Sequence, residues 1–231
     1  MFIARVAVGS EVVFAAVDGV DDRDSDLPVD ARLRVIDVHP FGEITFTGQE
    51  VTGAQARLLA PVLPSKVIAV GRNYAAHAAE MGNDVPAEPM IFLKPNTSVI
   101  GPGAEIRLPA MSQQVEHEAE LAIVFGRLCR EVPEERVAEV ILGYTCANDV
   151  SARDHQIKLG GGQWCRGKFF DTFAPLGPVL VCLHPGPPRC LPHPSLKPSQ
   201  NQSLTPNPNL SPNLSPRRLQ SQSLQQDQTT P

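Results

Sequence analysis

The stretch from Val115 to Gly126 constrains the fold more than any other part of the sequence. It begins with alternating glutamates, continues as an apolar run and ends at a glycine. This pattern predicts a β-strand that enters a buried sheet. Because successive side chains of a strand point to opposite faces, we expect Glu118 and Glu120 on one face, with Glu116 just before them.

Two carboxylates on one face of a strand repel each other. Their Cα atoms are roughly 6.5–7 Å apart, and unpaired carboxylates resist burial. A divalent cation that takes oxygen ligands would resolve this conflict. A solvated, acidic entrance to the strand would resolve it as well, and this stretch alone leaves both interpretations open.

Charge composition argues against one class of partner. Residues 1–183 contain 16 basic and 24 acidic side chains, within a chain of 231 residues that is 42% hydrophobic. That length allows one large or two small domains with a sizeable core. An acidic body argues against a nucleic-acid partner and is compatible with cation binding.

Cysteine usage and the absence of long apolar runs indicate the compartment. The five cysteines are odd in number and show no CxxC spacing, which favours free thiols in a reducing compartment over a disulfide framework or a zinc site. The N-terminus lacks a signal-peptide core, and no apolar run has the length of a membrane span. We therefore expect a cytoplasmic protein without a membrane partner.

Residues 1–60 are predicted to form a small β-rich domain. Two apolar, β-branched runs, Phe2–Val8 and Glu11–Val17, flank the pair Gly9-Ser10, which is a hairpin signal. Further strand-like runs follow at residues 32–38 and 42–51. None of these residues carries obvious chemistry, so a packing or dimerisation module is the expected role.

Residues 65–182 carry the candidate site residues. Their patterns predict strands at 66–71, 90–95, 105–108 and 176–182, and helices at about 74–82 and 133–142. His77 and Glu80 would be neighbours on one helix face. They could be a general base oriented by a carboxylate, or an exposed ion pair.

Two further residues have alternative interpretations. Asp149 follows an expected strand and would be either a third oxygen ligand beside the glutamates or a helix cap. Lys168 precedes two phenylalanines and would be either a surface lysine or a desolvated lysine that faces a developing anion.

Taken together, these stretches resemble the fumarylacetoacetate hydrolase family, in its small bacterial-type branch with an extra N-terminal domain. The resemblance covers about residues 1–182. The stretches that carry it, in matching order and spacing, are Val70–Tyr74 with His77 and Glu80, Phe92–Pro95, His117–Ala122, Gly143–Asp154, and Lys168 in its aromatic setting.

The resemblance implies an α+β, mostly β fold. It would be a mixed β-roll preceded by the small β-rich N-terminal domain. It also implies a Mg²⁺ or Mn²⁺ ion held by Glu118, Glu120 and Asp149, which agrees with the preference of hard cations for carboxylate oxygens. A homodimer is a further implication.

The resemblance also implies an enzyme that acts on small 2-oxo or 1,3-dicarbonyl acids. Family members hydrolyse C–C bonds, decarboxylate oxaloacetate, or isomerise intermediates of aromatic catabolism, all through an enolate. By similarity, His77 would activate water or shuttle a proton, Glu80 would orient it, and Lys168 would stabilise the oxyanion or enolate. The alternative is a catalytically inactive, metal-binding remnant.

Residues 183–231 have a different composition. From residue 184 on they contain no Val, Ile, Met, Phe, Tyr or Trp but hold 11 of the 23 prolines. Such a segment buries too little apolar surface to offset its ordering entropy, so we expect disorder. We interpret it as a frameshifted end that replaces the family's last strands and leaves the catalytic domain incomplete.

Overall fold

The structure is a computed structural model that describes residues 1–18, 27–74 and 86–182. Most elements within these residues are strands: β1 Phe2–Val8, β2 Glu11–Asp18, β3 Arg32–Ile36, β4 Phe46–Thr52, β5 Arg57–Leu59, β6 Val67–Gly71, β7 Met90–Lys94, β8 Val99–Ile100, β9 Val115–Glu116, β10 Ala119–Phe125, β11 Ile141–Asn148, β12 Ser151–Ala152 and β13 Ala174–Cys182. The expectation of a mostly β fold is confirmed.

Helical segments in the described residues are short. Four are 3₁₀ turns and one, η4, is a π-helical turn: η1 Gly53–Gln55, η2 Asn96–Ser98, η3 Glu134–Glu139, η4 Asp154–Leu159 and η5 Trp164–Gly167. None of these helices is long and apolar enough to cross a membrane.

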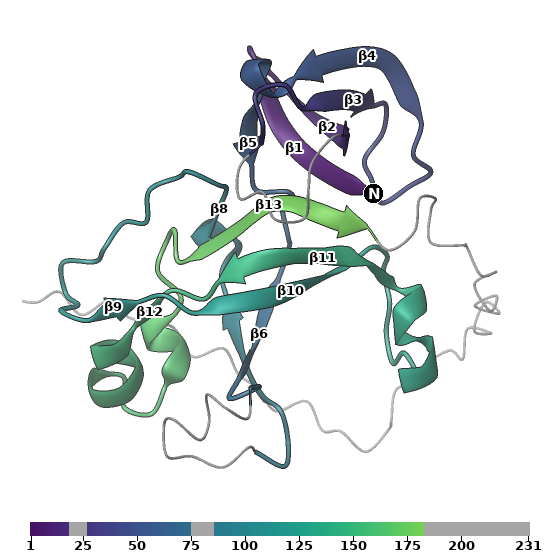
Figure 1. Ribbon diagram of the computed structural model, residues 1–231. Helices are drawn as coiled ribbons and strands as arrows, with labels where there is room; N and C mark the ends of the chain where they lie inside the picture. Colours follow the sequence, from purple (N-terminus) through teal and green to yellow (C-terminus); the bar gives the residue numbers. More distant parts are fainter. Residues whose placement is uncertain (19–26, 75–85, 183–231) are drawn as a thin grey trace, which may run out of the picture. The chain divides into compact units, whose positions relative to one another are not determined.

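One large sheet joins the first strands of the chain to the last described one. Within the described residues its order is β10-β11-β13-β1-β2-β3-β4, while β5 also pairs with β1 and β8 pairs with β13. In Figure 1 the strands β10, β11 and β13 run side by side. The long-range pair β1–β13 is antiparallel, with Phe2 opposite Val181. The sheet therefore spans the two regions that the sequence suggested as domains.

Strand β1 contributes to two hydrophobic cores because its side chains alternate between two faces. Ile3 packs in the cluster that includes Leu142 and Leu180, on the side of β11 and β13. Ala4 and Val6 belong instead to the cluster enclosed by β1 to β5. All three β1 residues are fully buried, so this strand fixes the first half of the chain to the sheet.

The hairpin predicted at Gly9-Ser10 is present. β1 and β2 pair antiparallel from Phe2 opposite Val17 to Val8 opposite Glu11, which leaves a two-residue turn. Gly9 has a φ of 58°, a left-handed conformation that glycine adopts without steric penalty.

Several local expectations are wrong. Residues 105–108 form no strand, and the expected helix at 133–142 is the 3₁₀ turn η3 followed directly by strand β11. Strand β10 was expected to enter a buried sheet, but its side chains alternate between half-buried and exposed, as do those of β6. The expected helix at 74–82 and the segment 183–231 lie outside the described residues, apart from Tyr74.

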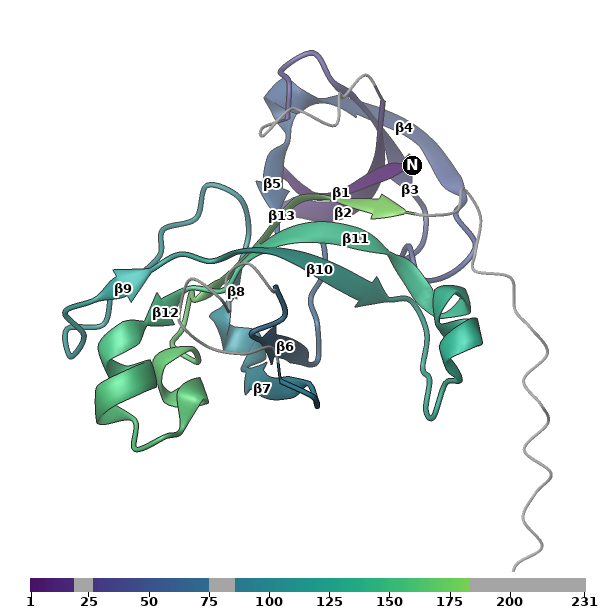
Figure 2. The ribbon, with the colours of Figure 1, turned by 60° about the horizontal axis from the view of Figure 1, so that its bottom comes forward.

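Strands β9 and β12 form a separate antiparallel pair, with Ser151 opposite Glu116. A small buried cluster of Val150, Ala152 and Phe173 supports it. The turns η4 and η5 follow in sequence and contact each other. Figure 2 shows these elements gathered beyond one end of β10 and β11, which is where the candidate site lies.

Candidate functional site: a buried carboxylate and lysine cluster

Lys168 is the centre of the cluster. Its Nζ donates hydrogen bonds to Glu118 Oε2 at 2.9 Å, Asp149 Oδ2 at 2.6 Å and Ser151 Oγ at 2.7 Å. The lysine is 2% exposed, so the surface interpretation is wrong. Three acceptors match the three protons of an ammonium group, and the charge of Lys168 is compensated within the protein.

Backbone pairing brings the two acidic partners of Lys168 together. Ala119 lies opposite Asn148 in the β10–β11 register. Just beyond the end of that ladder, Asp149 N donates to the carbonyl oxygen of Glu118 at 2.9 Å. The side chain of Asn148 accepts a hydrogen bond from Glu118 N at 3.1 Å. Glu118 and Asp149, 31 positions apart in the sequence, therefore present their carboxylates at one point.

A second buried lysine, Lys94, binds the same aspartate. Its Nζ donates to Asp149 Oδ1 at 2.5 Å and to the carbonyl oxygen of Val150 at 3.2 Å. Burial lowers the pKa of Lys94, and Asp149 partly opposes that shift. Lys94 was not among the site residues predicted from the sequence. A lysine that closes the apolar run Met90–Leu93 is nevertheless a signal, because buried charges need partners.

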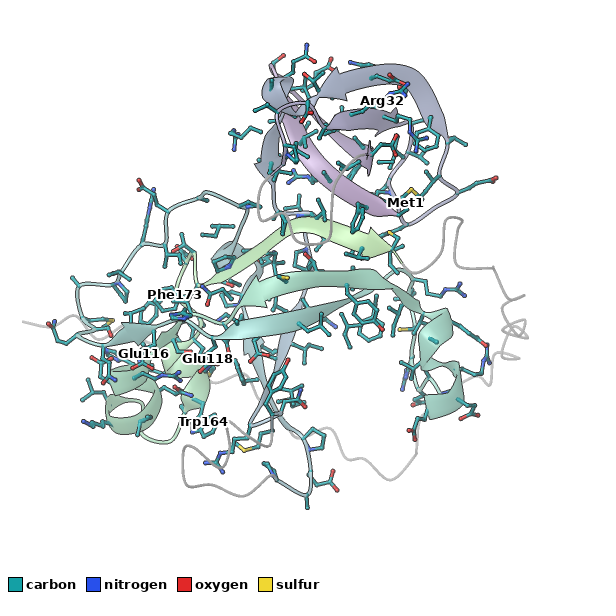
Figure 3. The ribbon with its side chains drawn as sticks, in the orientation of Figure 1. Met1, Arg32, Glu116, Glu118, Trp164 and Phe173 are labelled. Atoms are coloured by element: carbon teal, nitrogen blue, oxygen red, sulfur yellow. The ribbon has the colours of Figure 1, made fainter. Side chains whose placement is uncertain are left out.

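Arg153, also missed, holds the glutamates from the other side. Its Nη1 lies 2.6 Å from Glu118 Oε1, and its Nε donates to Glu116 Oε2 at 2.8 Å. Gln156 Oε1 accepts a third bond from Nη1 at 2.8 Å. Figure 3 shows Glu116 and Glu118 next to each other at this end of the molecule.

The pKa values of Glu118 and Glu120 are shifted in opposite directions. Burial raises the pKa of Glu118, but Lys168 and Arg153 outweigh burial and leave it below its ordinary value. The pKa of Glu120 is raised, first by burial and then by the negative charges of Glu118 and Asp149. A hydrogen bond with Tyr74 opposes that rise only in part. Glu120 is therefore the carboxylate whose charge its surroundings balance least.

The predicted site residues divide into two groups. Glu118, Asp149 and Lys168 are in direct contact, and Glu120 interacts electrostatically with all three. His77 and Glu80 lie outside the described residues. In the described part of the chain, no set of three or more His, Cys, Asp or Glu side chains is arranged as a ready metal cage; the lysines occupy the carboxylate oxygens instead.

A cavity of about 860 Å³ lies beside the cluster. Its lining includes Lys94 from β7 and aromatic side chains from three segments, Phe92, Trp164 and Phe169. The Nζ of Lys168 lies 5.1 Å from the centroid of the Phe92 ring. The cavity is thus lined by Lys94, is separated from Lys168 by the Phe92 ring, and is large enough for a small organic acid.

Fold and site together define a β-rich protein with a buried centre of carboxylates and ammonium groups, which is a type of site that enzymes use to stabilise anions. The family model "Fumarylacetoacetate (FAA) hydrolase C-terminal" matches residues 66–193, and "Rv2993c-like, N-terminal" matches residues 1–61. The chain therefore belongs to the fumarylacetoacetate hydrolase family, as the sequence motifs indicated.

Relatives and solved structures agree with this assignment. Protein Rv2993c of Mycobacterium tuberculosis is 52% identical over 181 residues, which cover 78% of this chain and 66% of that protein. Oxaloacetate tautomerase fahd2, mitochondrial, of Xenopus laevis is 51% identical over 125 residues, which cover 54% of this chain and 39% of that protein. The chain thus spans less than two thirds of either relative.

The crystal structure of 5-carboxymethyl-2-hydroxymuconate delta-isomerase from Mycobacterium smegmatis is similar to this fold. The TM-score is 0.69 at 51% identity, and the match covers 80% of this chain and 68% of that one. This similarity confirms the predicted fold class. The division at residues 60, 65 and 182 stays a prediction.

Proposed function

We propose that this chain forms the metal and anion site of an enzyme that interconverts 2-oxo acids and their enols through an enolate. The observation that carries the proposal is Lys168, a buried ammonium group that contacts Glu118 and Asp149. The relatives named as a tautomerase and an isomerase support this type of reaction over C–C bond hydrolysis and decarboxylation, the other reactions considered for the family.

By their chemistry, three carboxylates of the cluster would be the ligands of a hard divalent cation such as Mg²⁺ or Mn²⁺. Glu118, Glu120 and Asp149 supply the oxygen donors that such ions prefer. The raised pKa of Glu120, caused by burial and by the other two carboxylates, indicates negative charge that a cation would balance. The bound ion would supply Lewis-acid polarisation of the 2-oxo group.

The remaining roles belong to side chains of the chain itself. Lys168 would place its positive charge beside the enolate as that charge develops. Arg153 would fix Glu118 through their 2.6 Å ion pair. His77 would move the proton between carbon and oxygen, oriented by Glu80, as the family resemblance implies.

The test combines metal binding with turnover. Mn²⁺ binding is measured by electron paramagnetic resonance and by the shift of the thermal unfolding midpoint, since only binding to the native state raises that midpoint. Turnover is measured as loss of the enol absorbance of oxaloacetate. The matched variants are Glu118→Ala and, as control, Glu139→Ala, whose carboxylate pairs with the exposed Arg136.

We expect the unmodified chain and Glu139→Ala to bind Mn²⁺ and to accelerate tautomerisation, and Glu118→Ala to lose both. Mn²⁺ binding without turnover would instead establish the metal-binding remnant. Failure to bind Mn²⁺ would contradict the assigned ligands.

A further inference from the structure

The three N–H groups of Lys168 are all used inside the protein. Their acceptors are Glu118, Asp149 and Ser151, and an ammonium group has three donors and no acceptor. A direct hydrogen bond from Lys168 to a substrate would therefore require the release of one of these acceptors. Leaving a buried polar group without its partner costs free energy, so such a release opposes the reaction.

Each acceptor of Lys168 is also held from another side. The Ser151 hydroxyl is fully buried and donates to the carbonyl oxygen of Asp149 at 2.9 Å, so its oxygen is left to accept the hydrogen bond from Lys168. Arg153 holds Glu118 through an ion pair of 2.6 Å. These contacts fix Lys168 in its present position.

The ring of Phe92 lies between Lys168 and the cavity. The Nζ of Lys168 lies 5.1 Å from the ring centroid, a cation–π contact that engages the face of the ring. Phe92 lines the cavity, and in the described part of the chain Lys168 does not. Lys168 therefore acts on a molecule in the cavity through its charge and not through a hydrogen bond.

Lys94 has a different count of donors and acceptors. Its Nζ donates to Asp149 Oδ1 at 2.5 Å and to the carbonyl oxygen of Val150 at 3.2 Å. Among the residues that the structure describes, these two acceptors are the partners of its three N–H groups. Lys94 also lines the cavity, so it is the buried ammonium with a donor left for a molecule bound there.

We propose that Lys94 is a catalytic residue that donates its third N–H to the substrate oxygen on which the enolate charge develops. Lys168 is then a positioning residue, which holds Glu118 and Asp149 together. This inference rests on the proposed function, since an enolate forms only if the site takes a 2-oxo acid. It gives the direct contact to a lysine for which the sequence analysis named no role.

The first test measures turnover and metal binding in parallel. Lys94→Met should lower kcat for tautomerisation of oxaloacetate with Mn²⁺ about a hundredfold or more, the effect of removing one donor to an oxyanion, with little change in KM. Lys94→Arg, which keeps a charged donor, should restore part of kcat. Mn²⁺ should bind to Lys94→Met at least as tightly as to the unmodified chain, because a positive charge beside Asp149 has been removed.

The control is Lys158→Met, which changes an exposed lysine in the last turn of η4 and should alter neither kcat nor Mn²⁺ binding. If Lys94 only positioned Asp149, kcat and Mn²⁺ affinity would fall together in Lys94→Met, and that result would overturn the proposal. An unchanged kcat would overturn it as well. Assays below the thermal unfolding midpoint of each variant exclude unfolding as the cause.

The second test measures the contact in the unmodified chain and needs no turnover. The chain has five lysines, so labelling their side-chain nitrogens with ¹⁵N gives few signals in nuclear magnetic resonance. Oxalate is a planar dianion with the shape and charge of the enolate end of a 2-oxo acid. With Mg²⁺ and ¹³C-labelled oxalate, dipolar recoupling should place Lys94 Nζ within about 4 Å of an oxalate carbon, as a hydrogen bond to its oxygen requires, and Lys168 Nζ farther away.

The signals are assigned by their loss in Lys94→Arg and Lys168→Arg, which both keep a positive charge in the cluster. A shorter distance from oxalate to Lys168 than to Lys94, or no contact with Lys94, would refute the proposal.

The two tests also separate this inference from the proposed function. If the unmodified chain does not turn over oxaloacetate with Mn²⁺, the proposed function fails and the oxalate contact alone decides the role of Lys94. If turnover is present and Lys94→Met keeps its kcat, only the role of Lys94 fails.

Discussion

Lys94 and Lys168 bind opposite oxygens of one carboxylate. The Nζ of Lys94 lies 2.5 Å from Asp149 Oδ1, and the Nζ of Lys168 lies 2.6 Å from Asp149 Oδ2. Two ammonium groups this close repel each other, and the arrangement is stable because Asp149 lies between them and Glu118 adds a second negative charge.

Removing Lys94 should therefore destabilise the fold. Lys94→Met keeps the length of the side chain but leaves Asp149 Oδ1 and the carbonyl oxygen of Val150 without their donor in a buried place. Removing one partner of a buried ion pair lowers the unfolding free energy by about 3 kcal/mol. Urea denaturation should show this loss, while Lys66→Met, which changes an exposed lysine that lines the same cavity, should stay within about 0.5 kcal/mol of the unmodified chain.

Gly143 is required for the pairing of β11 with β13. A Cβ at this position would lie 2.2 Å from the carbonyl oxygen of Val181, so Gly143→Ala must separate the strands. We expect a loss of more than about 3 kcal/mol of unfolding free energy, in the range of severe overpacking. Gly9→Ala is the comparison, because Gly9 has open space and only its positive φ opposes substitution; it should lose about 1 kcal/mol. Equal losses of unfolding free energy in the two variants would contradict the close approach of Gly143 to the carbonyl oxygen of Val181.

The buried thiol of Cys182 should make stability fall at alkaline pH. Burial raises the pKa of Cys182 from 9.0 to about 11. A raised folded pKa means that the native state favours the protonated thiol, so this contribution to stability is complete below pH 9.0 and is lost as the pH rises to about 11. Denaturant unfolding from pH 8 to pH 11 measures this loss of unfolding free energy. The Cys182→Ala variant should lack the part of the loss that comes from the thiol.

Thiol reactivity provides a second check on Cys182. At pH 8, iodoacetamide labelling mapped by mass spectrometry should modify the exposed Cys129 and Cys146 and leave Cys182 unmodified until the chain unfolds. Fast labelling of native Cys182 would contradict its burial.

The exposed apolar side chains of β6, β7 and β10 should bind hydrophobic probes. On β7, Ile91 and Leu93 are 69% and 60% exposed, and on β10 Leu121 and Ile123 are 60% and 50% exposed. On the β6–β7 pair these side chains are neighbours, since Ile91 lies opposite Val70 and Leu93 opposite Ile68, and a contiguous apolar surface promotes association. The double variant Ile91→Thr/Leu93→Thr should lower the fluorescence of bound anilinonaphthalene sulfonate and reduce aggregation in light scattering. An unchanged probe signal would show that the surface lies elsewhere.

Local sequence patterns determined the elements that depend on neighbouring residues. Gly9-Ser10 specified the first hairpin because a two-residue turn with a positive φ needs glycine. The apolar runs that became β7 and β13 were predicted with bounds close to those observed. The family resemblance assigned Glu118, Asp149 and Lys168 to one site, and in the structure Lys168 contacts both carboxylates; the roles of the three residues stay predictions.

Only the tertiary structure decided what covers each strand and which charges balance the cluster. Hydrophobic periodicity predicted β10 as a strand, but in the described part of the chain one face of it stays uncovered, so alternate side chains are exposed. The residues after η3 continue as β11 because long-range pairing with β10 and β13 outweighs local helix propensity. Lys94 and Arg153 became site residues only because folding brings them to carboxylates far away in the sequence, and no local pattern contains those contacts.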